Sequence, residues 1–410
     1  MNRIVLIGNG FDLAHNLPTR YEDFINWYWN EVVCSLVSNY TDTYSDKLCT
    51  LKIKQSTWSQ YAFNNWNLLC LCSDEYIRNI ISDKDNFEVK LSPFLQNICQ
   101  SIANKKWVDI ENEYYHLLNE CVFFTASFGY KELNEQLSFI QKKLVEYLTQ
   151  IKFYDINETI INTDIKNKIY SPIEPRDIAV QDKMALEKHF RYWIQTNEEK
   201  WGFKFYQYAI KDNRKSAIIE FIKKYLHTFP ENDLLIDLKD YPKEFLLPDN
   251  IMLLSFNYTN TANYYWIKNE GFSINYIHGK LSHPDSIIFG YGDEIDSHFQ
   301  QLLEQNKNDI LDNIKSIKYL ESENYRNVLS FMESGPYQIF VMGHSCGNSD
   351  RTLLNTLFEH KNCVSIKPFY YVKEDGSDNY LEIIKNISRN LTDMKLMRDR
   401  VVNKIYCEPM

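Results

Sequence analysis

The feature that most constrains the fold is the distance along the chain between the first strand and its expected partners. Residues 2–10 (NRIVLIGNG) form a short β-branched apolar run that ends in glycine, which is typical of a buried parallel strand entering a turn. From about residue 21 to about residue 248 the pattern is mainly helical, with apolar residues at three- and four-residue spacing. A buried strand needs neighbours, so we expect the first strand to join a sheet formed by the distant carboxyl-terminal part.

Strands and helices alternate after Pro248, and this alternation predicts a mostly parallel sheet with helices on both faces. Strands are expected at residues 252–256, 273–277, 286–289, 338–342 and 364–372. Helices are expected near residues 261–270, 298–315, 321–333, 350–360 and 378–390. The predicted fold is therefore α/β and Rossmann-like. It comprises a discontinuous domain of residues 1–20 and 249–395, a mainly helical insertion or cap of residues 21–248, and a tail of residues 396–410.

Composition disfavours several classes of protein. The 410 residues carry a formal net charge of −10, which makes nucleic acid an unlikely partner because such a chain repels phosphate. No apolar run is long enough to span a membrane, and the apolar start at residues 4–7 is too short for a signal peptide, so we expect a cytoplasmic protein. The nine cysteines form no CxxC pair and the nine histidines are scattered, so we expect neither disulfides nor a metal site.

Four short motifs follow predicted strands, and ligands of doubly wound sheets bind beyond the carboxyl ends of the strands. The first motif is Gly8-Asn9-Gly10-Phe11-Asp12. Its glycines would let backbone N–H groups approach a phosphate. The third glycine of the dinucleotide fingerprint is missing, so the motif is equally consistent with a tight strand-to-helix turn in which Asp12 caps the helix.

The second and third motifs place one polar side chain at the end of each of two strands. Asn257 in SFNYTNT follows strand 252–256, and His278 in IHGK follows strand 273–277. Such an asparagine can bond a ribose hydroxyl or position a water, and such a histidine can act as a general base. The structural alternatives are a helix cap for Asn257 and a purely structural role for His278. Because the two strands are predicted to be consecutive, we expect both side chains at the same rim of the sheet.

The fourth motif, GHSCG at residues 343–347, matches the GxSxG nucleophile elbow of serine hydrolases. A nucleophile at Ser345 would need an acid and then a histidine later in the chain. His360 falls in the helix that the elbow would begin, and Asp350 stands on the first turn of that helix, where it suits a cap. We therefore interpret Ser345 as a hydrogen-bond donor to a ligand.

Together these motifs resemble the AbiH family of bacterial abortive-infection proteins, whose members act in defence against phage. The resemblance rests on IGNGFDLAHNLPTRYEDF, SFNYTNT, IHGK, FGYGDE and VMGHSCGNSD, and WVDIENEY looks like a further family stretch. It covers both ends of the chain and implies an intracellular defence effector. The partners to consider are then a phage-derived trigger and a second copy of the chain.

The order of the motifs is also similar, more distantly, to that of sirtuin-like NAD-binding domains. The resemblance implies that Asn257 holds the ribose or the attacking water and that His278 is the base acting on a ribose hydroxyl. It implies contacts to NAD from Gly8, Asn9, Gly10, Phe11, Asp12, Pro18, Gly343, His344 and Ser345.

This chain departs from the sirtuin pattern at several positions. Asp12 stands where the pattern has serine, Asn16 where it has glycine, and Thr259 where it has aspartate. A zinc ribbon with four cysteines is also missing, so protein deacylation is not expected.

Several functions follow as hypotheses. The first is a phage-defence effector that binds NAD or a related nucleotide and hydrolyses its nicotinamide–ribose bond. The alternatives are a nucleotide sensor without catalysis and a serine hydrolase using Ser345. A nuclease built on Asp109 and Glu111 is a further alternative, although two acids on one helix usually form a solvated face.

Overall fold

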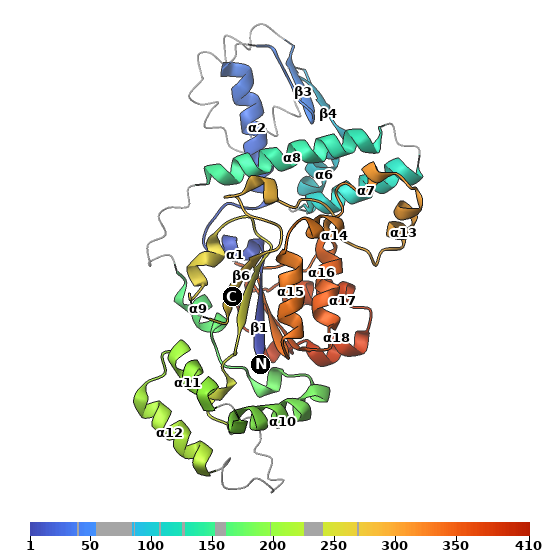
Figure 1. Ribbon diagram of the computed structural model, residues 1–410. Helices are drawn as coiled ribbons and strands as arrows, with labels where there is room; N and C mark the ends of the chain where they lie inside the picture. Colours follow the sequence, from blue (N-terminus) through green and yellow to red (C-terminus); the bar gives the residue numbers. More distant parts are fainter. Residues whose placement is uncertain are drawn as a thin grey trace.

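A five-stranded parallel sheet lies at the centre of the protein (Figure 1). It is seen in a computed structural model that describes residues 1–38, 41–54, 84–85, 87–105, 108–124, 128–151, 161–196, 198–224, 241–268 and 270–410. The strands stand in the order β6-β5-β1-β7-β8. Their bounds are β1 Asn2–Ile7, β5 Ile251–Ser255, β6 Phe272–Tyr276, β7 Tyr337–Met342 and β8 Cys363–Phe369.

The first strand occupies the middle of this sheet, as its sequence predicts. Val5 of β1 pairs in parallel with Leu253 of β5 on one side and with Phe340 of β7 on the other. Counted along the chain, the order is 3-2-1-4-5, so the direction of winding reverses between β1 and β7, which is where ligands bind in such sheets. The α/β fold with a mostly parallel sheet is confirmed, whereas a Rossmann-like or sirtuin-like relationship stays a prediction.

Helices cover both faces of the sheet because alternate strand residues point to opposite sides. On one face, strand residues such as Ile4 and Val341 pack against α15 Asn324–Glu333, α16 Arg351–Glu359 and α17 Tyr380–Asn390. On the other face, Val5 and Ile7 pack against α1 Asn9–Leu13, α9 Thr163–Ile169 and the 3-10 helix η6 Thr261–Tyr265. Both faces of the sheet are therefore buried, which explains the continuous apolar runs in its strands.

Some predicted elements differ from the structure. Residues 286–289 are not a strand, because Ser286 ends a 3-10 helix, Pro284–Ser286, and the chain then continues outside the sheet. The helix expected at 298–315 is shorter, α13 Ser297–Glu304, and the one at 261–270 is reduced to η6. The expected tail contains most of α18 Met394–Arg400, and Val401 forms a bridge with Ile366 of β8.

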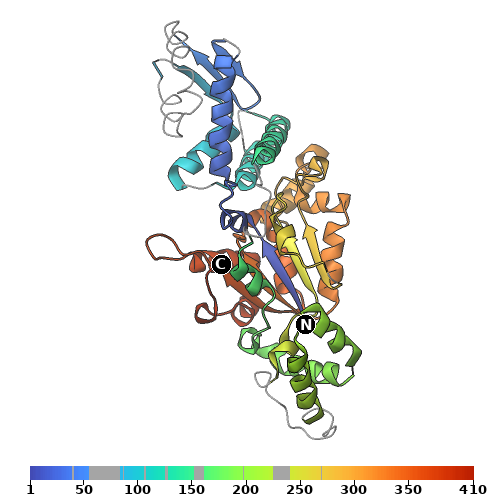
Figure 2. The ribbon, with the colours of Figure 1, turned by 90° about the vertical axis from the view of Figure 1, so that its left-hand side faces the viewer.

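The inserted region forms two bodies at opposite ends of the sheet (Figure 1). The distal block, formed by the described residues between 21 and 151, lies beyond the carboxyl ends of the strands, and Figure 2 shows it from the side. It contains α2 Tyr21–Ser38, α6 Pro93–Lys105, α7 Ile110–Phe123, α8 Tyr130–Gln150 and an antiparallel sheet of β2 Thr43–Ser45, β3 Cys49–Ile53 and β4 Phe87–Leu91.

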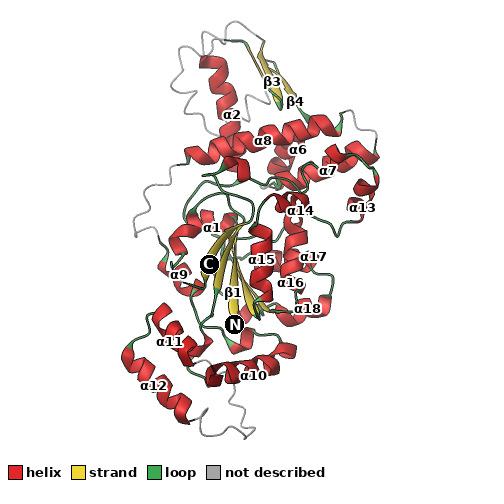
Figure 3. Cartoon of the chain, viewed as in Figure 1, coloured by secondary structure: helices red, strands yellow, loops and turns green. Residues whose placement is uncertain are grey.

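The second body, the basal block, lies near the amino ends of the strands. It contains α10 Val180–Thr196, α11 Glu198–Gln207 and α12 Asp212–Ile222. Figure 3 shows the helical predominance of both blocks, which the sequence pattern predicts, together with the strands of the distal block, which it misses.

The turns after β1 and β7 pack backbone against backbone. The Gly8 amide donates to the Met342 carbonyl (3.3 Å) and the Gly10 amide donates to the Gly343 carbonyl (2.8 Å). Gly343 has a φ of +73°, and a Cβ added there would lie 2.1 Å from the Phe11 nitrogen. Glycine at residue 343 is therefore required both by the backbone conformation and by the close approach of the two turns.

We expect Gly343→Ala to destabilise the protein far more than Gly376→Ala. Both glycines have positive φ, but a Cβ at Gly376 meets no described atom within 4 Å. The left-handed conformation alone costs alanine about 1–2 kcal/mol, and the clash at Gly343 should raise the loss to about 3 kcal/mol or more. Equal decreases in melting temperature, measured by calorimetry, would contradict this account of the junction.

Candidate functional site

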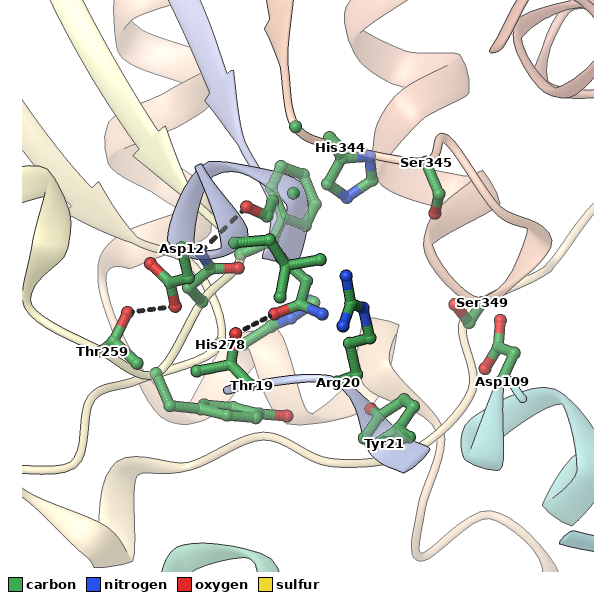
Figure 4. A pocket seen from close by; sticks show the side chains of 18 of the residues that line it. Asp12, Thr19, Arg20, Tyr21, Asp109, Thr259, His278, His344, Ser345 and Ser349 are labelled. Carbon is green, nitrogen blue, oxygen red and sulfur yellow. Dashed lines mark hydrogen bonds between the residues drawn. The ribbon is translucent and has the colours of Figure 1, made fainter. Parts of the chain in front are cut away.

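A cavity of about 430 Å³ lies between the carboxyl ends of the sheet strands and the distal block (Figure 4). The turns after β1, β5, β6 and β7 form one wall. The other wall comes from the distal block and is formed by Tyr21, Glu22, Val108, Asp109, Glu111, Leu144 and Leu148. The cavity therefore exists only because both parts of the chain meet at this edge of the sheet.

Most residues predicted for the site line this cavity. They are Gly8, Asn9, Gly10, Asp12, Asn257, His278, Gly343, His344 and Ser345. Two predicted residues do not line it. The buried ring of Phe11 packs 5.1 Å from the rings of His15 and Tyr265, and the carbonyl of Pro18 accepts a hydrogen bond from the Tyr147 hydroxyl (2.6 Å).

The predicted use of the glycine amides needs correction. The amides of Gly8 and Gly10 donate to carbonyls of the β7 turn, so in this conformation they are not available to a diphosphate. The Asn257 side-chain nitrogen likewise donates to the Gly8 carbonyl (2.9 Å). The first, second and fourth motifs therefore bind one another, and their glycines serve chain packing rather than phosphate contact.

Asp12 presents a buried carboxylate to the cavity. It lies inside α1 instead of capping it, and only 1% of its surface is exposed. One carboxylate oxygen accepts from the Thr259 hydroxyl (2.7 Å), whereas Oδ1 finds no hydrogen-bond partner among the described residues. Burial raises the pKa of Asp12. A ligand group that donates a hydrogen bond would satisfy the unpaired oxygen.

Behind the cavity wall, a fully buried lysine joins two carboxylates. The Lys315 ammonium lies 2.7 Å from Asp350 Oδ1 and 2.8 Å from Glu111 Oε2. Burial opposes ionisation of Asp350, but Lys315 outweighs it and holds the pKa of this carboxyl well below its usual range. The predicted capping role of Asp350 is wrong, because its side chain makes no cap hydrogen bond to α16.

His278 is held by the same carboxylate. Its Nε2 lies 3.3 Å from Asp350 Oδ1 and 3.2 Å from the Tyr319 hydroxyl. Burial lowers the pKa of His278, and Lys315 lowers it further, against the opposing effect of Asp350. With its proton on Nε2, facing Asp350, the neutral ring keeps a lone pair on Nδ1, for which the described residues supply no hydrogen bond. The ring can therefore accept a proton.

A second histidine lies on the other oxygen of Asp350. The Cys346 amide donates to His344 Nδ1 (3.0 Å), so the ring proton of neutral His344 is on Nε2. That nitrogen lies 3.4 Å from Asp350 Oδ2. Asp350 therefore fixes the orientation of two histidines of the cavity wall.

Sequence reasoning missed several charged residues of the cavity. Asp109 and Glu111 were expected on a solvated face, but Glu111 is buried and both line the cavity. Arg20 also lines it, and no carboxylate in the described ranges pairs with its guanidinium, which points toward the middle of the cavity (Figure 4). Arg20 lies within IGNGFDLAHNLPTRYEDF and the two acids within WVDIENEY, so these stretches carried the signal.

The geometry does not favour a serine nucleophile. Ser345 is exposed at the cavity, and in the described structure no histidine bonds to its hydroxyl. His344, the adjacent histidine, uses its two nitrogens for the Cys346 amide and Asp350. The non-glycine residue with positive φ in this turn is Cys346, at 54°, rather than Ser345, and the thiol of Cys346 is buried.

No group of three or more His, Cys, Asp or Glu side chains in the described ranges is placed to hold a metal ion. Among the helices that the structure describes, none combines the length and apolarity needed to cross a membrane.

Fold and site define an α/β protein with a cavity between the strand ends and an inserted, mainly helical block. The family model described as bacteriophage abortive infection AbiH matches residues 4–372. The chain belongs to this family, which confirms the first resemblance. No curated protein and no solved structure matches the chain, and the sirtuin-like resemblance stays a prediction.

We expect Asp350→Asn to destabilise the protein strongly, because it leaves buried Lys315 with a single carboxylate. Breaking a buried pair in this way costs about 3–5 kcal/mol. Asp378→Asn is the control, since the Asp378 pair with Lys404 lies at the surface.

The depressed pKa of Asp350 also sets the pH dependence of this loss. The contribution of the carboxylate is complete above the pKa of an unfolded aspartate, about 3.9, and is lost as pH falls through the lower folded-state value. The difference in melting temperature between wild type and Asp350→Asn should therefore narrow in acid. An equally small loss of melting temperature in Asp350→Asn and Asp378→Asn at neutral pH would contradict the assignment of Asp350 as a buried partner of Lys315.

Proposed function

We propose that this abortive-infection protein binds NAD or a related nucleotide in the cavity and hydrolyses the bond between nicotinamide and ribose. The observation that carries the proposal is His278, a histidine held by Asp350 at the cavity wall, whose Nδ1 receives no hydrogen bond from the residues that the structure describes. Loss of NAD would stop the metabolism of an infected cell, which fits the family description of bacteriophage abortive infection.

The charges of the cavity suit the two ends of such a ligand. Cleavage of the nicotinamide–ribose bond passes through a sugar carbon with positive character, which nearby carboxylates stabilise. Asp12 and Asp109 supply carboxylates at the cavity, and Arg20 supplies a guanidinium for a phosphate group. A ligand with a cationic ring and an anionic diphosphate matches this distribution.

The role proposed for each side chain depends on its polar atoms that make no hydrogen bond to the described residues. His278 would take a proton from a ribose hydroxyl or from the attacking water. Asn257 donates its amide to Gly8, and its side-chain oxygen would accept from that hydroxyl or water. The bond from the ribose carbon to nitrogen breaks with its electron pair leaving on nicotinamide. The water oxygen then bonds to the ribose carbon, and its proton leaves through His278.

A sensor without catalysis is the second candidate. The observation that favours it is Asp12, a buried carboxylate at the cavity where the sirtuin pattern has serine, because this change would alter or end the chemistry. Such a protein would bind the nucleotide and report its level without cleaving it.

We expect purified protein to release nicotinamide from NAD, and His278→Ala to lower the rate by about 10²–10⁴-fold, the contribution typical of a general base. His283→Ala is the matched control, because His283 is exposed and does not line the cavity. Chromatography of the reaction mixture measures nicotinamide, and calorimetry measures NAD binding.

Three outcomes would contradict hydrolysis at this site. Equal rates of nicotinamide release in wild type and His278→Ala would show that His278 is not the general base. Binding without turnover, also in the presence of phage components, would favour the sensor. Labelling by a fluorophosphonate that Ser345→Ala abolishes would favour a serine hydrolase.

A further inference from the structure

The distal block reaches the candidate base through two buried residues. Glu111, on the first turn of α7, contacts Lys315 (2.8 Å). Lys315 contacts Asp350 (2.7 Å), and the same oxygen of Asp350 lies 3.3 Å from His278. These contacts link a helix of the distal block to the carboxyl end of β6, where His278 lies.

Further contacts hold both Glu111 and Lys315 in place. Glu111 Oε1 accepts from the Gly290 amide (3.0 Å), and the ring of Tyr115 stacks on Tyr291 at 3.9 Å, so α7 docks on the segment after the β6 turn. The Lys315 amide donates to the Tyr291 carbonyl (2.9 Å). Glu111 and Lys315 are therefore held on the same segment, residues 290–291, one through its side chain and the other through its backbone amide.

We propose that Glu111 and Lys315 are positioning residues through which the distal block sets the reactivity of His278. The proposal deepens the proposed function and rests on it for the role of His278 as a base. It makes the distal block part of the site, since a residue of α7 contributes to the charge balance behind the base.

The direction of the effect follows from the charged and titratable groups around His278. They are Asp350 and His344 beside the β7 turn, Lys315 and Tyr319 from α14 Lys315–Lys318 and the 3-10 helix after it, Tyr258 after β5, and Glu111 from α7. Loss of Lys315 leaves two carboxylates without their cation, which favours protonated His278. Burial raises the pKa of Glu111 to about 8 against the pull of Lys315, so loss of Glu111 removes less charge and favours neutral His278 only weakly.

The test is a titration of His278 by NMR of protein labelled with ¹³C-histidine, with the resonance assigned from a His278→Gln variant. We expect Lys315→Met to raise the pKa of His278 by about one pH unit or more, the size of effect typical of a neighbouring charge. Lys367→Met is the matched control, because Lys367 forms a buried pair with Asp177 (2.8 Å) and lines no part of the cavity. Glu111→Gln should shift the titration the other way and by less than Lys315→Met, because the raised pKa of Glu111 leaves less charge to remove.

Two results would overturn the proposal. One is an unchanged titration in Glu111→Gln, which keeps the side-chain shape and carries the test alone where Lys315→Met does not fold. The other is an equal shift of the His278 pKa in Lys315→Met and Lys367→Met, which would indicate a general loss of packing rather than a specific effect of Lys315.

The titration needs no substrate, so it separates this proposal from the proposed function. Shifted titrations without any release of nicotinamide would support the link and contradict hydrolysis. If the protein hydrolyses NAD, the acid limb of its kcat/KM profile should move with the titration.

Discussion

The pairing of β1 between β5 and β7 is the constraint on which the rest of the structure depends. A six-residue strand at one end of the chain completes the middle of a sheet whose other strands lie beyond residue 250. Buried Arg3 adds to this position, because its guanidinium donates to the carbonyls of Ile169 and Ser171 and to the side chain of Gln338 on β7. The inserted residues therefore follow β1 and precede β5, its neighbour in the sheet. The distal block comes to lie over the carboxyl ends of the strands.

The cavity follows from this arrangement, and its electrostatics follow from Lys315. Glu111 belongs to the distal block and Asp350 to the sheet region, and their buried carboxylates would repel each other without a cation between them. Lys315 keeps Asp350 ionised, and Asp350 in turn orients His278 and His344. The same contacts therefore hold the two parts of the chain together and prepare the candidate base.

Sequence patterns predicted the elements whose signal is local. The apolar runs of β1, β5 and β7 and the polar residues after them could be recognised one by one, and so Asn257, His278 and His344 were expected at one rim. The glycines were also recognised, but the sequence did not indicate that they allow two turns to pack against each other. A G-x-G turn that approaches a phosphate and one that approaches another turn have the same sequence, and only the position of Gly343 against Phe11 distinguishes them.

The charge cluster could not be predicted because its members are separated by most of the chain. Glu111 sits on an amphipathic helix and Lys315 on a short one, and each residue alone looks like part of a solvated surface. Asp350 begins a helix, so its local pattern indicates a cap although its side chain turns to Lys315. Burial and pairing over more than 200 residues are properties of the folded chain alone.

We propose that hydrolysis of NAD or a related nucleotide in the cavity depends on His278 during infection. The most direct measurement is the NAD content of phage-infected host cells that express either the wild type or His278→Ala at equal protein levels. The account predicts that NAD falls after infection in cells with the wild type and is maintained in cells with the variant. Equal NAD content in the two, with phage defence intact in both, would contradict it.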